Sequence, residues 1–172
     1  MKRNWLLDDI FDGIATKLDV RQFRPQDVLS EIKQSILEAA RLMGSGINTQ
    51  HWWFIVVECK DQLKKLAEDS TSRQWVAEAN FAIIVLTNPK HKFHMIDAGR
   101  CCRTTQLAAW NRGVALGLFA DIKEDKLRND FGIPKELNIA VVIGFGLSCR
   151  QVDRQEKGSR AAWRAGPLWK IR

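Results

Sequence analysis

The chain has 172 residues, of which 45% are hydrophobic, and this size and composition favour one globular domain over a disordered or fibrous protein. No apolar run approaches the roughly 20 residues needed to cross a bilayer, and Asp8 and Asp9 break any signal-peptide pattern, so we expect a cytoplasmic protein without membrane partners. The four cysteines form no C-x-x-C pair, which predicts reduced thiols rather than a disulfide framework.

The net charge of +7 is concentrated near the C-terminal end of the chain. Residues 150–172 carry seven basic and two acidic side chains, whereas the first 149 residues are nearly neutral. The same segment contains two tryptophans, Trp163 and Trp169, which are costly to leave in water. We therefore divide the chain into a domain over residues 1–149 and an extension over 150–172 that docks on the partner subunit, and we expect nucleic acid to be an unlikely partner.

Hydrophobic periodicity predicts both helices and strands. The strand candidates are short β-branched or aromatic runs, and the fourth helix has small residues at steps of three and four that suit a central position. In chain order the assigned elements are helices 5–14 and 28–40 (N-cap Asp27), strands 53–58 and 81–86, helix 95–109, strand 113–119, helix 123–130 and strand 139–143. With a further helix, for which no bounds are assigned, between the first two strands, the full order α, α, β, α, β, α, β, α, β predicts a layered α/β or α+β domain, in which helix 95–109 is the fourth helix.

Three patterns that carry chemistry in other proteins have more ordinary explanations here. Gly144-Phe145-Gly146 lacks the third glycine of a dinucleotide-binding turn, so we interpret it as a tight turn ending a strand. His91, His94 and Asp97 recur every three residues, but without further ligand candidates they predict a solvent-facing helix start and no metal site. Neither a G-x-S-x-G nor a P-loop motif is present. Such a chain fits an enzyme whose cofactor carries the electron chemistry.

Four segments resemble the nitroreductase family. KLDVRQFRP, starting at Lys17, is similar to the family's R-R-[SD]-V-R-x-F pattern, and SGINTQHW, starting at Ser45, is similar to its A-P-S-x-x-N-x-Q-P-W loop. QWVAEA from Gln74 and FGIP from Phe131 match two later elements. The resemblance covers residues 14 to about 146. It implies an α+β, three-layer fold with a central mixed, mainly antiparallel sheet flanked by helices.

The resemblance also implies a homodimer with two interfacial FMN sites. Lys17 matches a phosphate-binding arginine of the family, and Arg21 matches the cation at the pyrimidine edge of the flavin. A cation there stabilises the negative charge that reduction places on the ring. The other cofactor-binding positions implied for the same subunit are Leu18, Asp19, Gln74, Phe119, Ala120, whose backbone N–H is expected near flavin N5, and Arg160.

The polar loop after Gly44 is implied to serve the neighbouring subunit. Ser45, Gly46 and Asn48 match positions that contact the flavin from the other subunit, while Gln50 supports the loop. Trp52 and Trp53, which follow, are interpreted as core packing.

Two departures from the family pattern bear on this site. Asp19 stands where a serine is usual, and its carboxylate would repel a phosphate unless it points elsewhere or pairs with Lys17 or Arg21. The two prolines of the loop pattern are replaced by Gly44 and His51.

The function implied by the resemblance is an FMN-dependent oxidoreductase. NADH or NADPH would supply hydride, which passes through flavin N5 to a flat small-molecule acceptor such as a nitroaromatic, quinone or enone. No side chain is expected to act as a covalent catalyst. One alternative is a flavin-cleaving enzyme similar to dimethylbenzimidazole synthase, supported by Lys17-x-Asp19-x-Arg21. A second is a non-enzymatic module that binds flavin or nucleic acid.

Overall fold

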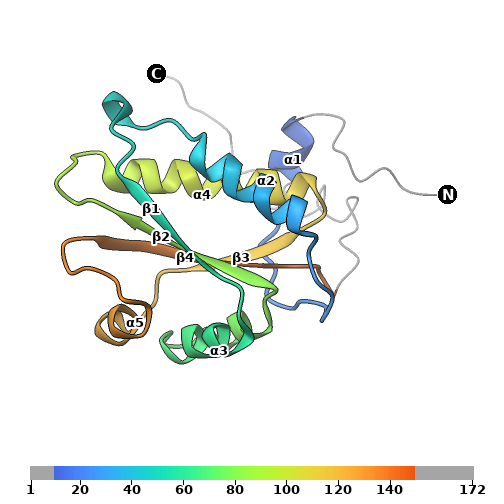
Figure 1. Ribbon diagram of the computed structural model, residues 1–172. Coiled ribbons are helices and arrows are strands. Elements are labelled where there is room, and N and C mark those ends of the chain that lie inside the picture. The colour runs from blue at the N-terminus through green and yellow to red at the C-terminus, as the bar shows by residue number, and fades with distance from the viewer. Residues whose placement is uncertain (1–9, 150–172) are drawn as a thin grey trace, which may run out of the picture.

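The computed structural model describes residues 10–149, which form an antiparallel sheet between two layers of helices (Figure 1). The Lys157–Arg160 region and the rest of the predicted extension lie outside the described residues. In chain order the elements are α1 (Ile10–Thr16), α2 (Ser30–Arg41), η1 (Gly46–Asn48), β1 (Trp52–Val57), α3 (Lys60–Glu68), η2 (Gln74–Glu78), β2 (Phe81–Thr87), α4 (His94–Asn111), β3 (Ala115–Phe119), α5 (Glu124–Phe131) and β4 (Asn138–Gly146).

The four strands lie in the order β1-β2-β4-β3, and each neighbouring pair is antiparallel. A register shift between Val85 and Leu86 interrupts the long pairing of β2 with β4. One isolated parallel bridge joins Asp19 to Leu116 outside the named strands. The predicted α+β fold with a mainly antiparallel sheet is therefore confirmed.

Both faces of the sheet are covered, which explains why every residue of β2 is buried. Phe81, Ile83 and Val85 point into a cluster shared with α2 and α4. Ala82 and Ile84, on the opposite face, point into a cluster shared with α3, η2 and α5. The three-layer arrangement is visible in Figure 1, where α2 and α4 lie on one side of the strands and α3 and α5 on the other.

Small side chains allow α4 to pack closely on the sheet, as the sequence predicts. Ala98, Cys101 and Ala109 are all buried in the cluster with α2. The four cysteines of the chain fall within the described residues and are free thiols. Between residues 10 and 149, none of the helices has the length and apolar character of a membrane span.

Helix α2 begins later than predicted, and Asp27 is not its N-cap. The helix starts at Ser30, preceded by Leu29, and has no side-chain cap. Asp27 instead accepts a hydrogen bond of 2.7 Å from the amide of Asn80, whose oxygen accepts one from the backbone N–H of Val28. A long-range partner has replaced the local capping contact, which the sequence pattern cannot reveal.

Two further predictions need correction. Trp53 was expected in the core but is 47% exposed, while Trp52 does pack partly against the cluster of α2 and α4. Gly144 and Gly146 lie inside strand β4 rather than in a turn after it.

Aromatic rings explain why glycines occupy these strand positions. A Cβ atom on Gly144 would lie 2.8 Å from the ring of Trp75, and one on Gly146 would lie 2.8 Å from the ring of Phe23. At Gly117 in β3, a Cβ atom would lie 2.7 Å from the backbone oxygen of Val20 and 2.9 Å from Trp75. These glycines leave room for the rings of Trp75 and Phe23 and for the backbone of Val20 close to the sheet.

Replacing Gly117 with alanine is predicted to destabilise the fold, because the backbone of Val20 cannot move away cheaply. Its N–H is bonded to the oxygen of Leu116 at 2.7 Å. We expect Gly117→Ala to lower the free energy of unfolding by about 1–3 kcal/mol, the usual cost of overpacking. Urea denaturation measures the change.

Gly99→Ala is the matched control, since nothing lies within 4 Å of its added Cβ atom. Gly99 is inside α4, where alanine is the better helix former by up to about 1 kcal/mol. Equal stability of the two variants would contradict the close approach of residue 20 to β3.

Candidate functional site

The two segments that resemble flavin-binding motifs lie at opposite edges of the sheet. The first, residues 17–24, runs beside β3, where Val20 donates to the oxygen of Leu116. The second, residues 45–50, leads directly into β1. Because β2 and β4 stand between these strands, the edges are roughly 14 Å apart across three strand spacings. One subunit therefore does not bring the two predicted halves of the site together (Figure 1).

The cationic segment is held by backbone pairing and has an internal ion pair. The ammonium group of Lys17 lies 2.6 Å from a carboxylate oxygen of Asp19. The Lys17 side chain is only 8% exposed, while that of Asp19 is 51% exposed. Leu18 is half-buried beside them, and Arg21 is exposed. Asp19 thus pairs with Lys17, whereas Arg21, like Arg24, faces solvent.

The far end of the same edge carries Phe119 and Ala120. Val20 bonds Leu116 on the outer side of β3, and alternate strand residues direct their backbone groups to the same side. Leu118 therefore directs its backbone groups outward as well, and Ala120 follows the end of β3 as an exposed residue. The ring of Phe119 is instead in the core, 5.7 Å from that of Trp75 in an edge-to-face contact. The Phe119 side chain is therefore engaged in core packing and is not exposed at this edge.

The predicted contact residue Gln74 lies on the α3 layer of the molecule. Its side-chain amide donates to the backbone oxygen of Ala67 at 3.3 Å, near the end of α3. The side-chain amide of Gln74 is therefore hydrogen-bonded to the protein itself, although the residue is exposed.

The loop over residues 45–50 has a strained backbone. Ile47, Asn48 and Gln50 have φ angles of 57°, 53° and 47°, in the left-handed region. Such a conformation costs a non-glycine residue about 1–2 kcal/mol, and a β-branched residue such as Ile47 is rarely found in it. Asn48 and Gln50 are exposed, as binding residues would be. The observed strain therefore requires compensation elsewhere in the loop.

Hydrogen bonds within the loop supply part of that compensation. The backbone N–H of Gln50 donates to the hydroxyl of Ser45 at 2.9 Å, and the hydroxyl of Thr49 donates to the oxygen of Gly46 at 3.0 Å. Each is worth about 0.5–1.5 kcal/mol. Ser45 therefore has a structural role in this conformation, in addition to the binding role that the sequence predicts.

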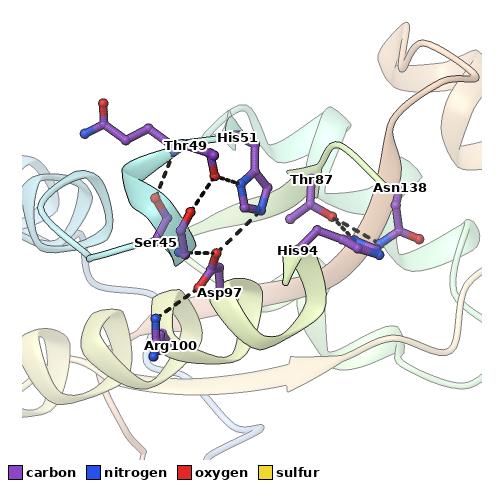
Figure 2. Close-up of polar contacts among 10 residues, drawn as sticks. Ser45, Thr49, His51, Thr87, His94, Asp97, Arg100 and Asn138 are labelled. Atoms are coloured by element: carbon purple, nitrogen blue, oxygen red, sulfur yellow. Dashed lines mark hydrogen bonds and ion pairs between the residues drawn. The ribbon is translucent and has the colours of Figure 1, made fainter. Parts of the chain in front are cut away.

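Asp97 of α4 ties the loop to the body of the protein (Figure 2). One of its carboxylate oxygens accepts the backbone N–H of Gly46 at 2.9 Å and lies 3.7 Å from Nε2 of His51. The other accepts a hydrogen bond of 3.2 Å from Arg100. Asp97 is fully buried, so the predicted solvent-facing helix start is wrong at this residue. The reason is the loop, which covers the first turn of α4.

All three histidines of the chain lie near Asp97. The rings of His51 and His91 are stacked with their centres 4.6 Å apart, and Nδ1 of His94 is 3.0 Å from the hydroxyl of Thr87. No group of three or more potential metal ligands occurs in the part of the chain that the structure describes. The contacts that the three histidines make are therefore ring stacking and hydrogen bonds with Thr49 and Thr87.

Sequence reasoning missed Asp97 and His51 as supports of the loop. Gly46 and Asp97 are 51 residues apart, so no local pattern links them. The available signal was the replacement of the expected prolines by Gly44 and His51, which removes two rigid residues and requires another way to fix the loop.

Comparison with known proteins decides the family. The model of the Nitroreductase family matches residues 14–88. A protein of Archaeoglobus fulgidus named as an NADH dehydrogenase/NAD(P)H nitroreductase is 30% identical over 163 residues, which cover 90% of this chain and 94% of the relative. The chain belongs to the nitroreductase family.

Solved structures of nitroreductases share the fold. An FMN-dependent nitroreductase from Clostridium difficile R20291 superposes with a TM-score of 0.77 at 22% identity, covering 82% of this chain and 88% of that one. A nitroreductase with bound FMN from Desulfitobacterium hafniense DCB-2 gives a TM-score of 0.72 at 20% identity, covering 85% and 92%. The three-layer architecture is thus that of the family.

In this nitroreductase, the stability of the fold is predicted to depend on the protonation of His51. Burial lowers the pKa of His51 below its ordinary value of 6.5, His91 and His94 lower it further, and the carboxylate of Asp97 opposes them. Arg100 lies on the far side of that carboxylate. As the pH falls below about 6.5, unfolded chains bind a proton that the folded protein resists, so the free energy of unfolding decreases.

The test compares the wild type with His51→Gln, which cannot titrate at this position. Melting temperatures at about pH 7.5 and pH 5.5 bracket the ordinary histidine pKa. The wild type should lose more stability across this interval than His51→Gln, since the carboxylates of both proteins titrate alike. Parallel losses would contradict the lowered pKa.

Proposed function

We propose that this nitroreductase is an FMN-dependent oxidoreductase that passes hydride from NADH or NADPH to a flat acceptor such as a nitroaromatic, quinone or enone. The observation that carries the proposal is the outer edge of β3. Arg21 follows the residue that is anchored at Leu116, and the exposed Ala120, just past the end of β3, lies roughly 13 Å further along the chain. An edge with a cation at one end and a backbone donor at the other suits an elongated, anionic ligand.

FMN supplies the hydride chemistry when it is bound, and the chain supplies binding and charge. The exposed guanidinium of Arg21 would balance the negative charge that accumulates on a reduced ring, and its planar fork suits adjacent acceptor atoms. The backbone N–H of Ala120 would hold an acceptor atom of the ring. Lys17 would face the phosphate, although its ammonium group is already paired with Asp19.

The position of the 45–50 loop supports a homodimer. Because the loop lies at the β1 edge, it can complete a site at the β3 edge only of another subunit. Exposed apolar side chains lie on the loop and on the nearby start of α4. We call them the apolar patch; they are Ile47, Phe93 and Ile96, which are 89%, 38% and 58% exposed. A second copy of the chain would cover this patch and bring Asn48 to its FMN.

The first test is the colour and cofactor content of the purified protein. We expect a yellow protein that releases FMN on denaturation, or an apoprotein that takes up FMN stoichiometrically. Arg21→Ala should weaken FMN binding by about tenfold or more, the usual effect of losing a charge-assisted hydrogen bond, and should make the flavin harder to reduce.

Arg41→Ala is the matched control for Arg21→Ala. Arg41 is an exposed arginine of α2 that pairs with Glu38, and losing such a pair has little effect on stability. A wild-type protein that is colourless and cannot be reconstituted with FMN would refute the proposal. Equal FMN affinity of the two arginine variants would remove Arg21 from the site.

The second test asks whether one FMN site uses two subunits. Arg21→Ala and Asn48→Ala homodimers should each have low NAD(P)H-dependent quinone reduction. Co-expressed with different tags, they should form mixed dimers in which one site has both changes and the other has neither. A mixture at equal amounts should recover about a quarter of the wild-type sites. No recovery from purified mixed dimers would place both residues in the same subunit's site.

The Lys17–Asp19 ion pair justifies one additional assay for the flavin-cleaving alternative. The acidic residue in this segment also occurs in the family's dimethylbenzimidazole synthases, which the chain resembles in Lys17-x-Asp19-x-Arg21. Aerobic incubation with reduced FMN, followed by a search for ring-cleavage products, distinguishes the two reactions. We expect FMN to be recovered intact.

A further inference from the structure

The 45–50 loop is seated on α4 at two neighbouring points. A Cβ atom on Gly46 would lie 2.7 Å from the ring of Phe93, so the backbone rests directly on this ring. One turn further along the helix, Asp97 accepts the N–H of Gly46. We propose that Asp97 is a positioning residue for the flavin site, an inference that rests on the proposed function.

The carboxylate of Asp97 is itself firmly held. Its own backbone N–H bonds to the oxygen of Phe93 within α4, and Arg100 donates to the oxygen that Gly46 does not use. Arg100 is 58% exposed along its side chain, whereas Asp97 is not exposed at all. The acceptor that meets the loop therefore belongs to the rigid body of the protein, and the loop takes its position from the helix.

Both ends of the strained segment converge on this carboxylate. Gly46, before the left-handed residues, bonds it directly, and Nε2 of His51, after them, lies 3.7 Å from the same oxygen without a hydrogen bond to it. Nδ1 of His51 lies 2.6 Å from the hydroxyl of Thr49, which links this ring back to the loop. Asn48 lies between Gly46 and His51 in the chain and is exposed. Asp97 thus closes the loop at its base and leaves Asn48 directed outward.

The loop needs such a closure because of its backbone conformation. Three consecutive or nearly consecutive left-handed residues, Ile47, Asn48 and Gln50, are unfavourable in a free peptide. The chain has no proline between Pro25 and Pro89 to restrict them. Holding this conformation before the ligand arrives avoids the cost of ordering the loop on binding.

A purely structural role for Asp97 predicts a different result from a positioning role. If the carboxylate only stabilised the fold, its loss would lower the melting temperature and leave the affinity of the folded protein for FMN unchanged. If it positions the loop, its loss releases residues 45–50 while the sheet stays folded. The loop completes the neighbour's site, so the affinity of folded dimers for FMN then falls.

The experiment compares Asp97→Ala, Asp97→Asn and Asp69→Asn in the full-length protein. Asp69 is the matched control because it is also a fully buried aspartate, but it pairs with Lys126 of α5 on the opposite helical layer. FMN affinity is measured by flavin fluorescence below the melting temperature of each variant. Amide hydrogen exchange of the apoproteins reports the order of residues 45–50 without any ligand.

Asp97→Ala should bind FMN about tenfold more weakly than the wild type and should lose the exchange protection of the Gly46 amide. Asp97→Asn keeps an oxygen acceptor and should recover part of both. Asp69→Asn should lose stability but keep the affinity and the loop protection. Wild-type affinity in Asp97→Ala, or unchanged protection of Gly46, would overturn the inference while the proposed function stands. Failure of the wild type itself to bind FMN would overturn both.

Discussion

The burial of β2 and β4 on both faces limits where a ligand can bind to this molecule. Each of the two strands pairs on both sides, and helices cover the sheet above and below. A sheet covered in this way has no open face for a ligand, so only its two edges and the ends of its strands remain. The segments that resemble flavin contacts occupy these edges, at β3 and before β1. The fold therefore keeps these two segments apart within one subunit, which is why the proposed site needs a second subunit.

Trp75 links this constraint to the cationic segment. Its ring lies over Gly117 of β3 and Gly144 of β4, where any side chain would collide with it. The same glycine in β3 allows the oxygen of Val20 to approach the sheet closely. Backbone pairing of Val20 with Leu116 then fixes the position of Arg21, one residue further along. The packing of Trp75 on the sheet thus influences where the backbone of Arg21 lies at the edge of β3.

The sequence predicts the elements well because their signals are local. Runs of β-branched and aromatic residues mark β1, β2 and β4, the apolar run over residues 113–119 marks β3, and small residues correctly mark α4 as a close-packing helix. Gly144 and Gly146 are misassigned to a turn because their real cause, the rings of Trp75 and Phe23, lies far away in the chain. The same limit applies to Asp97. Its burial depends on a loop 51 residues earlier, so spacing alone suggests an exposed helix start.

Lys17 and Asp19 show how geometry alters a prediction based on charge. By sequence, Asp19 weakens the phosphate site, but the structure makes it a partner of Lys17 instead. The Lys17 side chain is nearly buried while Asp19 is half exposed, so the ammonium group needs an anionic partner, whereas the carboxylate can still reach water. A phosphate monoester carries about −1.5 to −2 charges, more than the carboxylate that it would replace. A phosphate at Lys17 would therefore have to replace the carboxylate as the partner of the ammonium group, while Arg21 is a further, exposed positive charge of the same segment.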